Sequence, residues 1–117
     1  KVQPSERINY YKRATVFVLP SFSSNGIIEA WGLTVNEALE AGCPVIATDA
    51  VGSSYDLLDG KSGIQIESCN VDAVSNAIKN FEVNEDMHIY CKNKAKQYSV
   101  EKMAEGFSRI IKKVSDV

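Results

Sequence analysis

The sequence has no long hydrophobic run, and its charge does not favour either sign. Its longest apolar stretches extend to about five residues, far short of the roughly 20 that cross a membrane. The 13 Lys and Arg residues nearly balance the 15 Asp and Glu residues, giving a net charge of −2. We therefore expect neither a membrane span nor an electrostatic surface for nucleic acid or anionic lipid. No signal-peptide pattern opens the chain, so a cytoplasmic location is the default expectation.

Cysteine and histidine are too few and too scattered to suggest a metal site or a disulfide framework. The three cysteines, Cys43, Cys69 and Cys91, are odd in number and form no C-x-x-C pair. We expect them to be buried or unreactive thiols. The single histidine, His88, lies in a polar helical stretch without a cysteine or carboxylate partner motif, which indicates a surface residue. No metal ligand is predicted.

What remains is the composition of one globular domain. Hydrophobic residues make up 44% and charged residues 24% of the 117 residues, enough to bury a single core. The chain begins at Lys1 without an initiator methionine and enters a helical pattern almost at once. We therefore interpret residues 1–117 as a single domain that belongs to a longer polypeptide.

Three short apolar segments are predicted to be strands of a parallel sheet. Residues 15–19 form a β-branched and aromatic run that ends at Pro20. Because the run lacks alternation, it suits a strand covered on both faces. Residues 45–47 and 64–66 are predicted to be a second and a third strand.

Helical periodicity connects and follows these strands. A helix capped by Ser5 is expected before the first strand, and residues 32–42 show apolar positions at helical spacing. After the third strand the chain is expected to be helical. Asn70 and Ser99 are predicted to cap two helices, and a further helix over 84–97 is predicted to bury three side chains. Those side chains are Met87, Cys91 and Ala95.

This alternation predicts an α/β fold with a Rossmann-like open parallel sheet, flanking helices and a helical C-terminal part. In such sheets ligands bind beyond the carboxyl ends of the strands. A functional site is therefore expected in the loops 20–28, 48–54 and 67–70.

Two glutamates flank the predicted start of the helix over residues 32–42. Glu29 lies just outside that helix and Glu37 lies one to two turns inside it, with seven residues between them. Gly32 and Leu33 stand at the helix start, where free backbone N–H groups and the helix dipole favour an anion. Phosphate suits the helix start and sugar hydroxyls suit the carboxylates, so a nucleoside diphosphate sugar fits both. On spacing alone, a second interpretation fits as well as a ligand site: Glu29 is a loop charge and Glu37 lies on a solvated helix face.

Several spaced motifs, taken together, resemble the retaining glycosyltransferases of family 4. They occur in the family's order and span nearly the whole chain. The motifs are Val18-Leu19-Pro20-Ser21, the E-x7-E pair, Glu37-Ala38-x-x-Ala41-Gly42-x-Pro44-Val45-Ile46-Ala47, and Asp59-Gly60-x-x-Gly63. The resemblance implies the GT-B fold, in which two Rossmann-like domains face a cleft. This chain would be part of the C-terminal, nucleotide-sugar-binding domain. The acceptor domain and the first part of this domain would be absent.

The resemblance also implies the site residues. Glu29 would approach the hydroxyls of the donor sugar as the catalytic residue, and Glu37 would bind the ribose. The backbone amides of Trp31, Gly32 and Leu33, followed by Thr34, would bind the sugar and its phosphate. The Trp31 side chain itself is expected to be a packing residue. The implied activity is transfer of a hexose from a nucleoside diphosphate sugar to a saccharide or lipid-linked acceptor, with retention and without a cofactor or metal.

The basic residues lie in the wrong place to bind a diphosphate. Lys12, Arg13 and Lys61 precede strands, so they are expected at the amino edge of the sheet, opposite the site. We therefore expect weak donor binding and no transfer by this piece alone. A sheet edge left uncovered would favour self-association. Attachment to the inner membrane would depend on the absent domain.

Two alternatives remain open. A flavodoxin-like binding module would carry an acidic phospho-acceptor pocket or a glycine-rich loop at the first strand, whereas that strand ends in Leu19-Pro20-Ser21. A GT-B nucleotide-sugar epimerase would need a different set of carboxylates and histidines.

Overall fold

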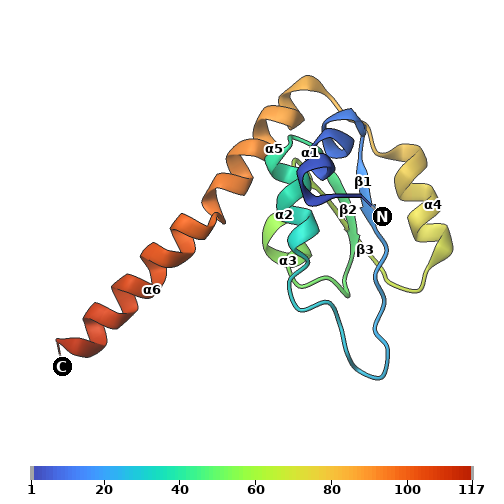
Figure 1. Ribbon diagram of the computed structural model, residues 1–117. Coiled ribbons are helices and arrows are strands. Elements are labelled where there is room, and N and C mark those ends of the chain that lie inside the picture. Colours follow the sequence, from blue (N-terminus) through green and yellow to red (C-terminus); the bar gives the residue numbers. More distant parts are fainter. Residues whose placement is uncertain (1, 117) are drawn as a thin grey trace.

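The computed structural model describes residues 2–116, which fold as three parallel strands and six helices (Figure 1). This confirms the predicted α/β class with an open parallel sheet and a helical C-terminal part. In chain order the elements are α1 (Pro4–Arg13), β1 (Phe17–Leu19), α2 (Leu33–Glu40), β2 (Val45–Thr48), α3 (Ser54–Leu57), β3 (Gly63–Ile66), α4 (Val71–Asn80), α5 (Glu85–Gln97) and α6 (Val100–Ser115).

The sheet has the order β1-β2-β3, and its central strand is the most deeply buried. All four residues of β2 are buried, as expected for a strand covered on both faces. The prediction for residues 15–19 was wrong in extent and burial, because β1 covers Phe17–Leu19 and is only half-buried. The physical reason is its position at the edge of the described sheet, where one side has no neighbouring strand.

The core lies between the sheet and the pair α2 and α5. Both glycines that bound α2 have positive φ angles, 87° at Gly32 and 82° at Gly42, so the helix is held to its short length. The predicted burial of three α5 side chains is confirmed, and they pack against a buried face of α2. In Figure 1, α4 lies on the other side of the strands from α2 and α5.

α1 begins differently from the prediction. Its N-cap is Gln3 rather than Ser5, and Pro4 occupies the first helical position, where its fixed φ angle is favourable. The Glu6 carboxylate accepts a hydrogen bond from the backbone N–H of Gln3 at 3.4 Å, which closes the first turn. The other predicted caps are confirmed, since the Asn70 and Ser99 side chains accept from the third residue of their helices.

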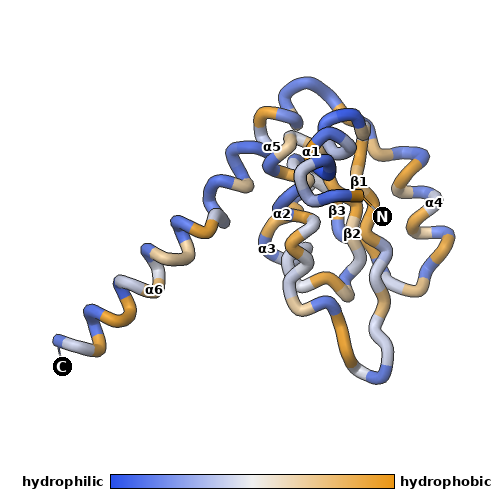
Figure 2. The backbone as a smooth tube through the Cα atoms, viewed as in Figure 1, coloured by the Kyte–Doolittle hydropathy of each residue, from blue (hydrophilic) through white to orange (hydrophobic). Residues whose placement is uncertain are grey.

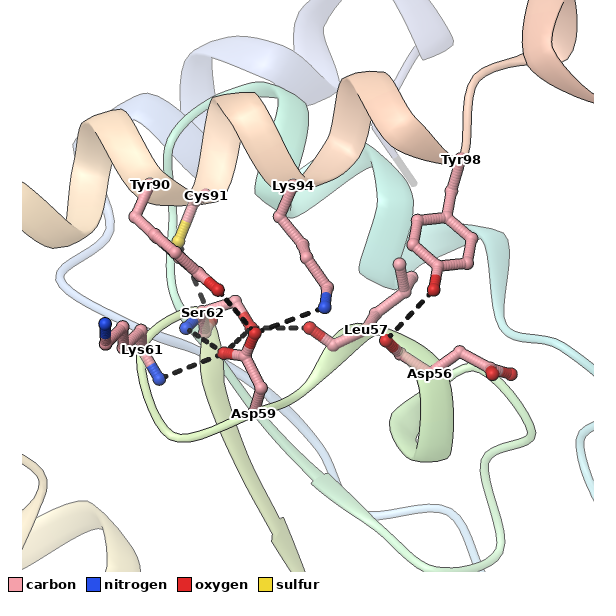
Figure 3. Close-up of polar contacts among 9 residues, drawn as sticks. All are labelled: Asp56, Leu57, Asp59, Lys61, Ser62, Tyr90, Cys91, Lys94 and Tyr98. Carbon is pink, nitrogen blue, oxygen red and sulfur yellow. Dashed lines mark hydrogen bonds and ion pairs between the residues drawn. The ribbon is translucent and has the colours of Figure 1, made fainter.

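Asp59, in the turn before β3, ties this turn to α5 (Figure 3). Its carboxylate accepts hydrogen bonds from the backbone N–H groups of Lys61 and Ser62, both at 3.1 Å. It also accepts from the Tyr90 hydroxyl at 2.6 Å and from the Lys94 ammonium at 3.1 Å. Burial alone would raise the pKa of Asp59, but these hydrogen bonds outweigh it and hold the pKa well below the ordinary value. The turn therefore fixes α5, and α5 in turn supports α2.

α6 leaves the body of the molecule and projects into solvent (Figure 1). None of its residues 100–115, all within the described part of the chain, is buried. Hydrophobic residues recur on each turn along its length (Figure 2). Across residues 2–116, no helix has the length and apolar character needed to cross a membrane.

Candidate functional site

The two loops that follow β1 and β2 are joined by backbone hydrogen bonds at the carboxyl edge of the sheet. The N–H of Glu29 donates to the carbonyl of Ala50 at 3.1 Å, and the N–H of Gly52 donates to the carbonyl of Glu29 at 2.9 Å. The N–H of Ser53 donates to the carbonyl of Trp31 at 2.8 Å. Glu29 and Val51 thus form a parallel bridge outside the main strands. The loop that carries Glu29 is therefore fixed to the core, although it lies far from β2 in sequence.

This junction requires a glycine at position 52. A Cβ atom on Gly52 would lie 1.9 Å from the carbonyl oxygen of Ala30, which no side chain tolerates. Gly32 is restricted for a second reason, since its φ angle is 87° and a Cβ there would lie 2.8 Å from Cγ1 of Val51. The close approach of the two loops therefore depends on both glycines.

The Glu29 carboxylate lies directly beside the start of α2. The Ser21 hydroxyl donates to Glu29 Oε2 at 2.7 Å, and the Ser21 carbonyl in turn accepts a hydrogen bond from the Thr48 hydroxyl. A Cβ atom on Gly32 would lie 3.4 Å from Glu29 Oε1, which shows how near the carboxylate is to the helix start. The structure thus brings Glu29 together with the predicted segment 31–34, at the edge where the fold predicts a ligand.

The start of α2 carries a polar group without a partner. Thr34 stands in the first turn of α2, and its Oγ1 is buried without a hydrogen-bond partner in residues 2–116. The first N–H groups of a helix also lack intrahelical acceptors. The helix start that the sequence predicts as an anion seat therefore combines backbone donors with a side-chain hydroxyl that can donate or accept.

Glu37 has a different environment, because it faces α1. Nη1 of Arg7 lies 3.0 Å from Glu37 Oε1 and 3.1 Å from Oε2, and the Tyr11 hydroxyl donates to Oε2 at 3.2 Å. Burial and the nearby Glu37 carboxylate raise the pKa of Tyr11 to about 12. The side chains of Arg7 and Glu37 are 42% and 36% exposed, so their ion pair contributes little stability and acts chiefly on orientation.

Arg7, Tyr11 and Ser21 were not predicted from the sequence as neighbours of the two glutamates. A signal for the first two exists, since positions 7 and 11 are four residues apart and share a face of α1. What the sequence does not reveal is that this face packs on α2 beside Glu37. Ser21 belongs to the quoted Val18–Ser21 motif, but its contact with Glu29 depends on the path of the loop.

The Trp31 side chain packs beside α5 rather than standing free. Its Nε1 donates to Asn36 Oδ1 at 2.7 Å, and its ring lies 6.3 Å from that of Tyr98, centroid to centroid. The ring also packs against the buried core. Between α2 and the α5–α6 junction lies an open groove of about 720 Å³, whose wall includes Trp31, Leu33, Glu37 and Met103.

The basic residues that the sequence placed at the amino edge are found there. Lys12 and Arg13 end α1 just before β1, and Lys61 precedes β3, where its ammonium lies 5.7 Å from the Tyr90 ring. Arg7 is the basic side chain that reaches a predicted site residue. Over residues 2–116, no group of three or more His, Cys, Asp or Glu side chains could hold a metal ion.

The cysteines and the histidine lie outside the site. Cys43 and Cys91 are buried, and burial raises their thiol pKa values to about 11 and about 12, which makes them poor nucleophiles. Cys69 is exposed. His88 is exposed, and its Nδ1 lies 2.7 Å from the carbonyl oxygen of Gly42, so it links α5 to the end of α2.

Comparison with solved structures identifies the fold. Sucrose-phosphate synthase from Thermosynechococcus elongatus superimposes with a TM-score of 0.74 and 22% sequence identity, over 92% of this chain and 27% of that protein. The likeness confirms the predicted fold as that of a GT-B glycosyltransferase domain.

Comparison of sequences identifies the family. Residues 1–98 match the profile described as "Glycosyl transferases group 1", and the chain therefore belongs to this family. The resemblance noted from the motifs is thereby confirmed at family level, and neither the flavodoxin-like module nor the epimerase is favoured.

Individual relatives are similar over part of their length. The chain is 34% identical over 86 residues to a D-inositol 3-phosphate glycosyltransferase of Paenarthrobacter aurescens (strain TC1). This match covers 70% of this chain and 20% of the relative. It is 41% identical over 66 residues to sucrose synthase 2 of Oryza sativa subsp. japonica. This match covers 56% of this chain and 8% of that relative. The chain thus spans at most about a quarter of the full length of these proteins.

Proposed function

We propose that this chain is the donor-binding portion of a retaining glycosyltransferase and binds a nucleoside diphosphate sugar at the carboxyl edge of its sheet. The observation that carries the proposal is the Glu29 carboxylate, held by Ser21 and placed beside the open start of α2. A carboxylate beside a row of N–H donors offers acceptors for sugar hydroxyls and donors for phosphate within one site. Membership of a glycosyltransferase family supports this use of the site.

In the proposed mode the diphosphate lies against the backbone N–H groups of residues 31–33, and Thr34 Oγ1 contacts one of its oxygens. The transferred hexose lies over Glu29. Glu37, further along α2, accepts hydrogen bonds from the ribose. Arg7 and Tyr11 leave lone pairs free on Glu37, because each carboxylate oxygen accepts more than one hydrogen bond.

Glu29 and Glu37 do not act as a glycosidase pair of acid and base, because the proposed reaction transfers a sugar and activates no water. Glu29 orients the sugar and stabilises the positive charge that develops at the anomeric carbon. The start of α2 stabilises the leaving diphosphate. We propose that no metal or cofactor takes part, and that the saccharide or lipid-linked acceptor is bound by another domain of a longer protein.

Binding tests this proposal directly. We expect saturation-transfer NMR to detect UDP-, GDP- or ADP-sugars at the chain with a Kd near millimolar, about −4 kcal/mol. The free nucleoside and the free sugar are the controls, and each should bind more weakly because each lacks the diphosphate. A chain that binds the nucleoside as well as the nucleotide sugar would contradict the proposal. Micromolar binding would show that this chain supplies its own strong phosphate contacts.

A further inference from the structure

The hydroxyl of Thr48 is a polar group in an otherwise apolar buried strand. Thr48 is 1% exposed and is the one polar residue of β2. The backbone pairing of β1 with β2 ends at Leu19, and Pro20 has no N–H group to continue it. The Thr48 hydroxyl instead donates to the carbonyl of Ser21. A buried side chain thus extends the hydrogen bonding of the sheet into the loop that leads to Glu29.

The loop between β1 and α2 is closed at its base. In Figure 1 this loop extends beyond the carboxyl edge of the sheet. Ser24 and Ile27 exchange two backbone hydrogen bonds, at 3.0 and 2.9 Å, so the outer part of the loop is a two-residue hairpin turn. At the base, the Ser21 hydroxyl donates to Glu29 Oε2 at 2.7 Å. This side-chain hydrogen bond holds the two ends of the loop beside each other.

The backbone of Glu29 is fixed without any help from Ser21. Its N–H donates to the carbonyl of Ala50, and its carbonyl accepts from the N–H of Gly52. These backbone bonds leave the side-chain torsions of Glu29 free to change between rotamers. Among residues 2–116, the Ser21 hydroxyl is the one group that donates to the Glu29 carboxylate. The direction of this side chain therefore depends on Ser21.

The two oxygens of the Glu29 carboxylate have different surroundings. Oε2 accepts the hydrogen bond from Ser21, whereas Oε1 accepts none from residues 2–116. A Cβ atom on Gly32 would lie 3.4 Å from Oε1, so this oxygen is on the side of the start of α2. A carboxylate oxygen can accept more than one hydrogen bond, so Oε1 is open to a ligand at the helix start.

We propose that Ser21 and Thr48 are positioning residues for Glu29. Thr48 fixes the Ser21 carbonyl, Ser21 binds Oε2, and Oε1 is thereby directed towards the start of α2 as the oxygen that contacts the transferred sugar. The sugar contact rests on the proposed function of this site, whereas the control of the Glu29 side chain by Ser21 does not.

The side-chain conformation of Glu29 tests the positioning without a donor. Three-bond NMR couplings of Glu29 in the wild-type chain should show one dominant χ1 rotamer. Ser21→Ala should give averaged couplings, because the carboxylate loses its hydrogen-bond donor. Ser21→Thr should keep the single rotamer, because it retains the hydroxyl. Ser23→Ala, at an exposed position of the same loop, is the matched control and should leave the couplings unchanged.

Thr48→Val should have a smaller effect of the same kind. This substitution removes the hydroxyl that holds the Ser21 carbonyl but leaves the Ser21 side chain in place. We expect partial averaging of the Glu29 couplings in Thr48→Val and wild-type couplings in Thr48→Ser. Unchanged amide shifts in α5 are the control for folding. The Ser21 variants decide the question if Thr48→Val does not fold.

Donor titration tests the assignment of Oε1 to the sugar. The readout is the Kd of free UDP, GDP or ADP divided by the Kd of the matching nucleotide hexose, from amide NMR of residues 31–34. Ser21→Ala should lower this ratio about fivefold, because a mobile carboxylate binds a sugar hydroxyl less well. The Kd of the free nucleoside diphosphate should change less than about twofold. Ser21→Thr and Ser23→Ala should keep the wild-type ratio.

Two results would overturn the proposal. A single Glu29 rotamer retained in Ser21→Ala would show that Ser21 does not set the direction of the side chain. A wild-type Kd ratio in a Ser21→Ala chain with averaged Glu29 couplings would show that the sugar does not depend on an oriented Oε1. A wild-type chain without any response to nucleotide sugars at residues 31–34 would instead contradict the proposed function, and with it the sugar contact. The coupling measurement distinguishes these failures, because it needs no donor.

Discussion

Glu29 and Glu37 are chemically identical, but their neighbours differ. Glu29 receives a neutral hydroxyl from Ser21, whereas Glu37 is bound by the cation of Arg7 and the phenol of Tyr11. Glu29 therefore presents its carboxylate close to the start of α2, where the transferred sugar is proposed to lie. Glu37 is paired with a cation and fixed in direction, which suits a contact that holds the donor and stays the same during the reaction.

Substitution of Glu29 should affect chemistry more than binding. In an intact enzyme that contains this chain, Glu29→Gln should lower kcat on the order of a hundredfold, with a smaller change in donor KM, because its contact strengthens as charge develops. Steady-state kinetics measure both constants. The substitution preserves volume at a half-buried position, so stability should change by less than about 1 kcal/mol. A folded variant with near wild-type kcat would show that Glu29 is only a loop charge.

Substitution at Glu37 should show the opposite pattern. Glu37→Gln should raise the donor KM and leave kcat nearly intact, because a ribose contact exists equally in the ground and transition states. Arg7→Met should also raise the donor KM, because it releases the Glu37 side chain. Lys12→Met, on the exposed side of the same helix, is the matched control. If Arg7→Met and Lys12→Met behave alike, Arg7 does not position Glu37.

The glycine at the loop junction should be irreplaceable. Gly52→Ala places a Cβ atom 1.9 Å from the Ala30 carbonyl oxygen, so the two loops must separate. The backbone hydrogen bonds that hold Glu29 are then lost. We expect a loss of about 2 kcal/mol or more in the free energy of unfolding, measured by urea denaturation. Gly106→Ala, with no atom near its added Cβ, should instead stabilise α6 by about 1 kcal/mol or less. Equal effects of the two substitutions would contradict the proposed junction.

At the scale of elements, the turn before β3 gives the fold a defined response to acid. The pKa of Asp59 is held below its ordinary value in the folded chain, so its contribution is present above the unfolded-state pKa of 3.8 and is lost as the pH falls below it. Asp59→Asn should cost about 2 kcal/mol at neutral pH and flatten this acid dependence. Urea denaturation between pH 7 and pH 3 is the measurement. A wild-type pH profile retained in the variant would assign the effect to another carboxyl group.

The order and type of elements were predictable from the sequence because periodicity and capping act over a few residues. The predicted caps Asn70 and Ser99 are confirmed for this reason. The short β1 and its partial exposure were not predictable, because strand burial depends on which neighbours flank the strand in space. The cap of α1 was misassigned because Pro4 and Glu6 outweigh Ser5 at the helix start.

The candidate site was predictable to a similar degree. Spacing along one loop and one helix placed Glu29, Gly32, Leu33 and Glu37 around one helix start at the carboxyl edge. The roles predicted for them, and for Trp31 and Thr34, came from the resemblance to the family. The contacts of Glu37 with Arg7 and Tyr11 join two helices 26 or more positions apart in sequence. No local pattern encodes such a contact, and its existence depends on how α1 packs on α2.

At the scale of the whole molecule, the chain divides into a compact body and a projecting helix. The body holds the sheet, the candidate site and the family match over residues 1–98, while α6 lies beyond that match. The proposed donor binding therefore belongs to the body.

Donor binding at the carboxyl edge is tested most directly by amide NMR of the chain during titration with nucleoside diphosphate sugars. We predict concentration-dependent shifts for the amides of residues 31–34, with smaller shifts at Glu29 and at residues 50–53 across the loop junction. The fitted Kd should be near millimolar. Glu29→Gln should reduce the response to the sugar-bearing ligand more than the response to the free nucleoside diphosphate. If the shifts instead appear elsewhere, for example only on α4, and residues 31–34 do not respond, the carboxyl-edge site is not the donor site.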